Sequence, residues 1–510
     1  MTMVPAPVHE DLFEAVHGGE DDTVVRLLRS GAPAEATDEE GGTVLYTAAV
    51  QGRAGIVRLL LAAGADPERG SGEGGGDLPL CGAACNGHTE AVRALLAAGA
   101  WPDQREEFGF TALAWAVRQG FADTVDVLLK YGANPGAAGP DGALPLVAAA
   151  RRGSVPVVRA LLERGAPGRE EALAEARAWL GRDVEGTLRE GLAEAHGEGF
   201  ETVTRRFPED GGVTVVVEAV RDGRPFAGRE QQTAHAAIAT LLETALGLRP
   251  PHEELAERAL RCADPSLDDW TEPAEALGRR GDEATFEAAV GWCASDDPLR
   301  QAFGADVLAR MTAWGGGAPS GGAGAGGAYG VRALPVLRQL AREVREPEVV
   351  TAVVRALGAQ GDTAALPDML RHAVHPDAGV RRGVAVAVTG LVPAGDREGV
   401  AALVALARDG DAAVRAAAVH ALAVAPEDSP AVREALAGRL DDDTPDPAVA
   451  AEAARGLAIR QDRRAVAALD RLLATAGPDG PAYTIALGTL EHIRDEATRR
   501  RLEHTLPRRR

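Results

Sequence analysis

The feature that most constrains this chain is a nine-residue phrase that returns at a fixed interval. VRALLAAGA occupies residues 92–100, and VRALLERGA follows 66 residues later at 158–166. Related phrases lie at 24–32, 57–65 and 125–133. Aligned on the glycine of the Gly-Ala pair, the five copies are 33, 35, 33 and 33 residues apart. This period is typical of stacked repeats, in which each unit buries its apolar face against its neighbours.

Each copy of the phrase predicts a helix enclosed by two glycines. A second glycine precedes the Gly-Ala glycine by twelve residues in every copy. Apolar residues between the two recur at helical spacing and predict one buried stripe. The first glycine permits a tight turn into the helix, and the second suits a left-handed cap that ends it. The pairs are Gly19 and Gly31, Gly52 and Gly64, Gly87 and Gly99, Gly120 and Gly132, and Gly153 and Gly165.

A second, shorter helix is predicted upstream of each inner glycine. The stretches TVLYTAA (43–49), LPLCGAA (78–84), TALAWAV (111–117) and LPLVAAA (144–150) resemble the T-P-L-H-x-A-A signature of ankyrin repeats, over about residues 8–168. Proline is kept only at Pro79 and Pro145, and the histidine is replaced by Tyr46, Cys81, Ala114 and Val147. The hydrogen bonds of that histidine are therefore not assumed here. The first copy lacks the signature, as expected of a polar N-terminal cap.

The resemblance to ankyrin repeats implies a binding face made of hairpin tips and inner helices. Position by position, its exposed, partner-binding slots are Glu39, Glu40, Gln51, Asn86, Phe108, Phe110, Arg118, Gln119, Arg151 and Arg152. Phe108 and Phe110 flank a glycine on a loop, where apolar rings are costly to solvate, so they are candidate contacts for a protein partner. The alternative is that both rings pack against the neighbouring hairpin.

A different repeat is predicted from about residue 283. Segments such as HPDAGVRRGVAVAV (375–388) and DGDAAVRAAAVHALA (409–423) place an apolar residue after a turn and before a helix. These residues are 50, 31, 34 and 35 positions apart, and removing the glycine-rich stretch 315–330 from the long interval leaves 34. We therefore expect 315–330 to be a loop insertion, which costs little closure entropy. The apolar positions are Leu299, Val349, Val380, Val414 and Val449.

The pattern D-x-x-V-R-x-x-A-x-x-A-L in these segments resembles HEAT or HEAT-like repeats over roughly 283–476. Arg300, Arg381 and Arg415 follow the apolar position. The resemblance implies that each of these arginines bonds an aspartate of a neighbouring turn.

Between the two repeat regions the sequence changes character. Residues 170–195 and 231–247 predict helices, while 201–207 and 213–220 are β-branched runs that predict a hairpin. We expect a predominantly α-helical chain of two solenoids joined by a small helix and β-hairpin module. The expected segments are an ankyrin array over 1–168, a linking module over 169–282 and a HEAT-like α-solenoid over 283–510. A function peculiar to this protein is expected in the linking module.

Composition narrows the class of protein. A chain of 510 residues is too long for one core. The net charge of −22 argues against binding to nucleic acid or anionic membranes. Four cysteines do not form a disulfide framework, and no signal peptide or long apolar segment is evident. We expect a cytoplasmic protein, and the bias toward Ala, Gly, Arg and Pro indicates a high-GC, bacterial genome.

Several motif matches are rejected, and no cofactor or metal is expected. Two glycine-rich stretches fit G-x-G-x-x-G, at Gly70, Gly72 and Gly75 and at Gly322, Gly324 and Gly327. Neither joins a strand to a helix, as a pyrophosphate site requires. HEELA at 252–256 lacks the second histidine of a zincin. Cys81, Cys85 and His88 could offer three zinc ligands, but ordinary positions in the repeat explain them better.

These observations favour a non-enzymatic scaffold that binds a protein of unknown identity through its repeat surfaces. One alternative is an enzyme on HEAT-like repeats, of the bilin lyase or DNA glycosylase type, with Trp270, Trp292 and Trp314 lining a cleft. The acidity and the absence of a defensible Cys-His pair weigh against it. Another alternative is a regulatory or immunity-type protein that blocks one dedicated basic partner by charge.

Overall fold

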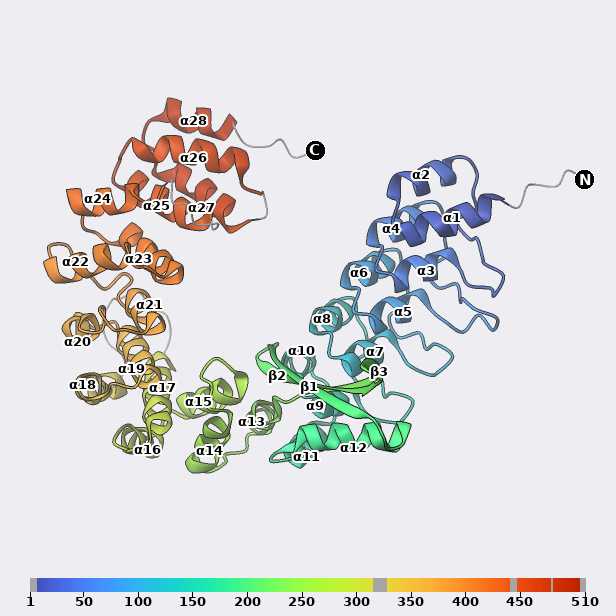
Figure 1. The fold of residues 1–510 in the computed structure, drawn as a ribbon, viewed down its shortest axis with the longest axis horizontal. Helices are drawn as coiled ribbons and strands as arrows, with labels where there is room; N and C mark the ends of the chain where they lie inside the picture. Colours follow the sequence, from blue (N-terminus) through green and yellow to red (C-terminus); the bar gives the residue numbers. More distant parts are fainter. Residues whose placement is uncertain (1–6, 315–327, 441–446, 478–479, 505–510) are drawn as a thin grey trace, which may run out of the picture. The chain divides into compact units, whose positions relative to one another are not determined.

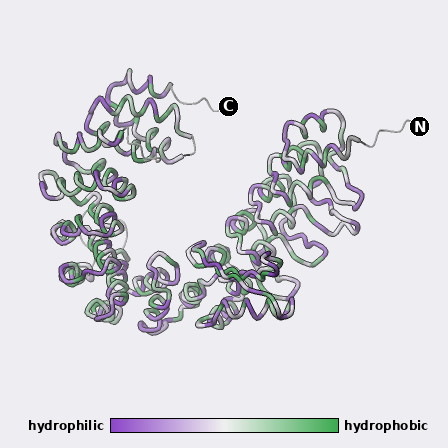
Figure 2. Tube along the Cα trace, in the orientation of Figure 1, coloured by the Kyte–Doolittle hydropathy of each residue, from purple (hydrophilic) through white to green (hydrophobic). Residues whose placement is uncertain are grey.

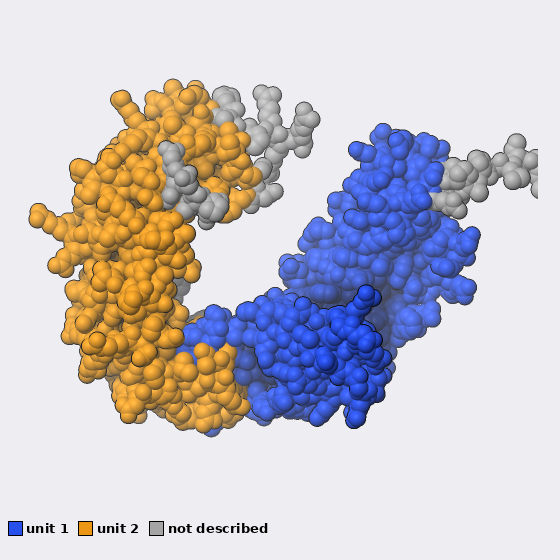
Figure 3. Space-filling model, viewed as in Figure 1, with its two compact units in different colours: residues 1–251, 264–273 blue, residues 252–263, 274–510 orange. Residues whose placement is uncertain are grey.

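The computed structural model describes residues 7–314, 328–440, 447–477 and 480–504. Its contacts divide the chain into unit 1 (residues 1–251 and 264–273) and unit 2 (residues 252–263 and 274–510) (Figure 3). The described residues form 28 α-helices, two short 3-10 helices and one three-stranded sheet (Figure 1). The prediction of a predominantly α-helical chain with two helical solenoids is therefore confirmed.

Unit 1 begins with five helix pairs that stack in sequence order. The first helix of each pair contacts the first helix of the next pair, and the second helices form a parallel row. All ten repeat glycines have a positive φ, between 68° and 101°, as the turn and cap positions require. The pairs are α1 (Pro7–Gly18) and α2 (Asp21–Arg29), α3 (Val44–Val50) and α4 (Ala54–Ala62), α5 (Pro79–Cys85) and α6 (Thr89–Ala97), α7 (Ala112–Gln119) and α8 (Ala122–Lys130), and α9 (Pro145–Arg152) and α10 (Val155–Glu163).

The inner helices of the array begin in two different ways. Thr43 and Thr111 are N-caps whose hydroxyl oxygens accept a hydrogen bond from the backbone amide three residues later. Pro79 and Pro145 instead occupy the first helical position, where no backbone amide is needed. The threonine and the proline of the repeat signature thus alternate between successive helix pairs.

The stack continues beyond residue 168 into a sixth pair. Helix α11 (Arg169–Trp179) packs on α9, and α13 (His235–Ala245) packs on both α10 and α11. Buried side chains of both helices, such as Leu173 and Ile238, belong to the same apolar core as the five earlier pairs. The helix expected over 170–195 is interrupted after α11, where Gly181 has a φ of 78°, and α12 (Val184–His196) follows.

Residues between α11 and α13 form an insertion with a small sheet. Strands β1 (Glu201–Glu209), β2 (Gly212–Arg221) and β3 (Arg224–Gln232) are antiparallel, in the order β1-β2-β3. Alternate residues of β2 are buried with Leu188 and Leu192 of α12. The predicted hairpin is confirmed as β1 and β2. The third strand was not predicted, because its sequence RPFAGREQQ is polar and largely exposed.

Unit 2 is a double row of helices, joined to unit 1 through α14 (His252–Cys262) and α15 (Asp268–Arg280). One row consists of α17, α19, α21, α23, α25 and α27, each contacting the next. Figure 2 shows apolar segments along the helices of both units and polar segments at many of the loops. The remaining elements are α16 (Glu283–Cys293), α17 (Pro298–Trp314), α18 (Ala328–Glu343), α19 (Pro347–Gln360), η1 (Thr363–Ala365), α20 (Leu366–Leu370), α21 (Ala378–Ala387), α22 (Arg397–Leu406), α23 (Ala412–Val424), α24 (Pro430–Ala437), α25 (Pro447–Ile459), α26 (Arg464–Thr475), α27 (Pro481–Thr489), η2 (Leu490–His492) and α28 (Glu496–His504).

The apolar positions that define the second repeat lie mostly in the core. Four of the five are buried, and Leu299 is half-buried. Of the expected glycine-rich insertion at 315–330, residues 315–327 lie outside the described part of the chain. The last three residues already belong to α18, so the insertion ends earlier than expected.

The three arginines of the second repeat make different contacts. Arg381 donates to both carboxylate oxygens of Asp409, at 2.7 and 2.8 Å, as predicted. Arg300 pairs instead with Glu253 of α14 at 2.7 Å, so the expected aspartate partner is wrong at this position. Arg415 donates to the carbonyl oxygens of Asp409 and Gly410. At all three positions the guanidinium ties a helix to a neighbouring loop or helix.

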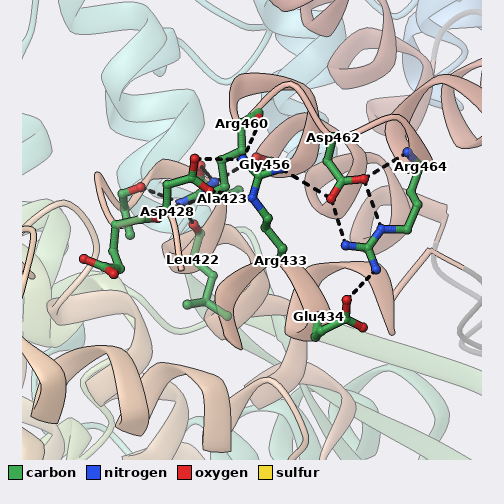
Figure 4. Close-up of polar contacts among 11 residues, drawn as sticks. Leu422, Ala423, Asp428, Arg433, Glu434, Gly456, Arg460, Asp462 and Arg464 are labelled. Atoms are coloured by element: carbon green, nitrogen blue, oxygen red, sulfur yellow. Dashed lines mark hydrogen bonds and ion pairs between the residues drawn. The ribbon is translucent and has the colours of Figure 1, made fainter. Parts of the chain in front are cut away.

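A buried arginine holds the end of α23 (Figure 4). Arg460 is only 6 % exposed, and burial lowers the pKa of its guanidinium. Its donors meet carbonyl groups at a helix terminus, which have no partners within their own helix. The accepting carbonyl oxygens are those of Leu422, Ala423, Ala425, Glu427 and Gly456, at 2.6 to 3.2 Å. Arg460 therefore satisfies a group of buried acceptors that no local hydrogen bond reaches.

Candidate functional site

A cleft of about 350 Å³ opens on the inner-helix side of unit 1. It lies between α7, α9, the loop that precedes α9, and the last turn of β3, and we call it the α7–α9 cleft. Four of the ten expected partner-binding residues line it, brought together from two successive repeats. The lining consists of Phe110, Ala114, Val117, Arg118, Ala137, Gly139, Asp141, Ala143, Pro145, Ala148, Arg151, Arg152 and Gln231.

An aromatic pair and an arginine form one wall of the cleft. The rings of Phe110 and Trp115 are stacked, with centroids 4.2 Å apart and an interplanar angle of 26°. The guanidinium of Arg118 lies 5.5 Å from the centroid of Phe110 and 5.8 Å from that of Trp115, which is within the range of a cation–π contact. Arg118 is exposed, and the described residues offer it no ion pair. This wall therefore presents apolar rings together with an uncompensated positive charge.

Trp115 was missed in the sequence analysis. It stands three residues before Arg118 on α7, a spacing that places two side chains on the same face of a helix. The loop residue Phe110 joins them because Thr111 caps the helix immediately after it. The spacing alone could have added Trp115 to the expected surface.

The two arginines at the end of α9 are already paired. Arg151 shares its guanidinium between Glu175, at 3.2 Å, and Asp141, at 3.8 Å. Arg152 forms an ion pair with Glu230 and also donates to the carbonyl oxygen of Glu230 at 3.0 Å. The side chain of Arg152 is only 12 % exposed, so the expectation of an exposed slot is wrong there. The cause is β3, which covers this side chain.

The end of the cleft is closed by contacts to the last carbonyl groups of α9. The Nε2 of Gln231 donates to the carbonyl oxygens of Arg151 and Arg152, at 2.9 and 2.6 Å. The Nε2 of His235 lies 3.3 Å from the carbonyl oxygen of Arg151. The imidazole stacks on Trp179 at 5.0 Å, and burial lowers its pKa to about 4. His235 is therefore a neutral structural group near pH 7.

The other expected partner residues are distributed along the array, outside the cleft. Glu39 and Glu40 are exposed before α3, and Asn86 is exposed at the end of α5. Gln51 and Gln119 are half-buried, and Gln119 lies near the thiol of Cys85. Phe108 is 63 % exposed, so its ring does not pack away against a neighbouring hairpin. Phe110 does pack, on Trp115.

The cysteines of the described chain show no sign of activation. Burial raises the pKa of the Cys81 and Cys293 thiols to about 12, which keeps both protonated near pH 7. His88, the third ligand of the rejected zinc site, is 2.9 Å from the carbonyl oxygen of Val50. Within the described ranges, no three histidine, cysteine or acidic side chains are arranged to hold a metal ion.

The tryptophans suggested for an enzymatic cleft do not form one. Trp270 is fully buried, and Trp292 is 4 % exposed, with its indole N–H donating to Glu253 at 2.7 Å. The side chain of Trp314 lies outside the described residues. The expectation of a cleft lined by these rings is wrong for the first two, because both serve as core residues.

Comparisons with known families agree with this architecture. A family model of ankyrin repeats, in three copies, matches residues 12–106 and again residues 80–170. The N-terminal region is an ankyrin-repeat array. A model of HEAT repeats matches residues 323–390, within the double row of helices of unit 2. The comparison with curated proteins finds no match to the chain.

Both repeat families are generally protein-interaction modules. The cleft lies on the part of the ankyrin array where α7 and α9 face the inserted strand β3. None of the described helices is long and apolar enough to span a bilayer.

Proposed function

We propose that this protein is a non-enzymatic adaptor whose ankyrin array binds another protein, with the α7–α9 cleft as the central contact. The observation that carries the proposal is the wall formed by Phe110, Trp115 and Arg118. Aromatic and arginine side chains supply most of the energy in protein interfaces, especially beside a concave pocket. Here they are partly exposed and lie together on one face.

The chemistry of the cleft defines a segment of the partner. Its volume of about 350 Å³ suits one large apolar side chain or a short stretch of peptide. Val117, Pro145 and Ala148 provide apolar contact, and Arg118 provides an unpaired donor for a carboxylate. The partner segment we propose therefore carries an apolar side chain next to an acidic group.

The residues outside the cleft extend the same proposed surface along the inner row. Phe108 is an exposed ring on a neighbouring hairpin, and it would contact a part of the partner beyond the cleft. Glu39, Glu40, Gln51, Asn86 and Gln119 occupy the earlier repeats of the same face. These residues would set orientation more than affinity, since polar residues at the rim of an interface contribute little.

The test compares capture of partners by two charge reversals. Arg118→Glu removes the unpaired cation of the cleft, while Arg58→Glu reverses an exposed arginine on the outer helix α4 and serves as the matched control. Tagged wild-type chain and both variants are used to capture proteins from the source cells. The captured protein is identified by mass spectrometry, purified and titrated against all three chains.

We expect the Arg118→Glu variant to bind the purified partner at least tenfold more weakly, with the control unchanged. Circular dichroism melts confirm that all three chains are equally folded. Equal affinity of the two variants would place the partner elsewhere on the chain and refute the assignment of the cleft.

A further inference from the structure

A second pocket of unit 1 lies on the other side of Arg152 and has the opposite charge. Its volume is about 240 Å³, and it is built from the start of α6, the turn between α7 and α8, the turn between β1 and β2, and the end of β3. We call it the acidic pocket, because four carboxylates line it against one guanidinium. The lining consists of Gly87, Thr89, Gln119, Gly120, Phe121, Ala122, Asp123, Thr124, Arg152, Glu209, Asp210, Glu230 and Gln232.

The charges of this pocket are only partly neutralised. Arg152 pairs with Glu230, and Glu209 accepts hydrogen bonds from Thr214 and Gln232. Asp123 and Asp210 have no cationic partner among the described residues. The pKa of Asp210 is raised by its partial burial and by the nearby carboxylates of Glu209 and Asp123. Two uncompensated carboxylates therefore stand close together at the pocket.

A buried amide provides an independent indication of a ligand. Gln232 is 4 % exposed and lines the pocket, and its Oε1 is buried without a hydrogen-bond partner. An amide oxygen can only accept, so a group that satisfies it must donate. Gly120 leaves room for such a group, since a Cβ at this position would lie 3.0 Å from that oxygen. An unsatisfied buried acceptor destabilises the free protein and favours a ligand that donates to it.

A second unsatisfied atom lies beside the first. The Nε of Arg152 is buried and has no acceptor, although the rest of its guanidinium is paired. A Cβ on Gly120 would lie 3.3 Å from this nitrogen, so the two atoms flank the same space. A ligand that meets both must offer a donor and an acceptor a short distance apart. A peptide residue with a cationic side chain and a backbone carbonyl has both.

We propose that the acidic pocket binds an arginine side chain of a protein partner. A guanidinium has five N–H donors in a planar array, which suits two carboxylates and an amide oxygen better than the three donors of an ammonium group. The ring of Phe121, which is 36 % exposed, offers a face for the guanidinium to stack on. This inference rests on the proposed function, because it assumes that the chain binds proteins.

The strand β3 separates the two oppositely charged sites. Neighbouring residues of a strand point to opposite sides, and accordingly Gln231 lines the α7–α9 cleft while Gln232 lines the acidic pocket. A partner that spans the strand would present an acidic group on one side and an arginine on the other. The inserted sheet thereby selects among partners in a way that the ankyrin array alone does not.

The experiment measures binding of a small probe to the full chain. The probe is the blocked tripeptide acetyl-Gly-Arg-Gly-amide, titrated by ligand-observed NMR. The matched probe replaces arginine with citrulline, which has nearly the same shape and no charge. The test protein is Asp123→Asn/Asp210→Asn. The control is Asp222→Asn, because Asp222 also has a positive φ in a turn, 54° against 51° for Asp210, and lies at the opposite end of β2.

We expect the arginine probe to bind wild type and the Asp222→Asn control equally, and to bind the double variant at least tenfold more weakly. The citrulline probe is expected to bind none of them measurably. Equal binding of both probes, or undiminished binding to the double variant, overturns the proposal. The Arg118→Glu chain separates the two hypotheses, because it should lose the captured partner yet keep the arginine probe. Loss of the probe alone in the double variant tests the acidic pocket without involving the cleft.

Discussion

Arg152 and Glu230 are 78 residues apart in sequence and are joined twice in the structure. One nitrogen of the guanidinium donates to the carbonyl oxygen of Glu230 at 3.0 Å, and another forms an ion pair with its carboxylate. Arg152 ends the inner helix of the fifth repeat, and Glu230 lies on the last strand of the insertion. The pair therefore fixes the inserted sheet to the ankyrin array between the two proposed binding sites.

Removing this arginine should loosen the sheet from the array. Arg152→Met keeps the apolar stem but removes the donors, and we expect the free energy of unfolding to fall by about 1–3 kcal/mol, as for other buried hydrogen-bonding groups. Glu230→Gln keeps the bonded backbone carbonyl and changes a side chain that is 51 % exposed. Its cost should be below about 1 kcal/mol. Urea unfolding followed by tryptophan fluorescence measures both, and equal effects would contradict this account of the contact.

The two phenylalanines of the third hairpin should behave differently. Phe108 is exposed, so Phe108→Ala should leave the thermal midpoint nearly unchanged while weakening the captured partner about tenfold or more. Phe110 stacks on Trp115, so Phe110→Ala should lower both the midpoint and the affinity. Calorimetry and titration of each variant separate the effects. Unchanged affinity in Phe108→Ala would remove this residue from the partner surface.

Acid should weaken unit 1 through His235. The imidazole of an unfolded chain titrates near its model value of 6.5, whereas burial lowers the pKa of His235 to about 4 in the folded protein. Between these values the unfolded chain binds more protons, so this contribution to stability is complete above about pH 6.5 and is lost as the pH falls toward 4. The loss amounts to about 3 kcal/mol at the lower limit.

The variant His235→Gln, which retains a donor for the carbonyl of Arg151, should abolish this part of the pH dependence. The measurement is the urea midpoint of wild type and variant between pH 7 and pH 4. His17→Gln changes an exposed histidine and is the matched control. If the difference between wild type and His235→Gln stays constant over this range, the titration of His235 does not contribute.

Unit 2 should depend strongly on Arg460. Arg460→Met leaves buried carbonyl oxygens at the end of α23 without donors, and we expect a loss above about 3 kcal/mol. Arg460→Lys restores one cation with fewer donors and should recover only part of the stability. Arg408→Met alters an exposed arginine of the same unit as the control. A midpoint for Arg460→Met equal to that of the control would show that water replaces the guanidinium at no cost.

The sequence by itself determined the repeat architecture. The interval of about 33 residues, the paired glycines and the leucine stripes specify helices that bury their faces against the next copy. Each of these signals is local or reaches only one repeat along the chain, so a single sequence displays it. For the same reason the second solenoid was recognisable from residues such as Val380 and Val414, and the hairpin of β1 and β2 from its β-branched runs.

Only the tertiary structure decided which predicted surface residues stay available. The polar sequence of β3 gives no strand signal, yet this strand covers Arg152 and contributes Gln231 and Gln232 to two different pockets. Trp270 and Trp292 resembled exposed aromatic residues in sequence but are buried by helices distant in the chain. Burial and ion pairing depend on contacts between segments tens of residues apart, and no periodic pattern encodes them. The sequence thus determines the stacked repeats, while long-range packing selects the residues that remain free to bind.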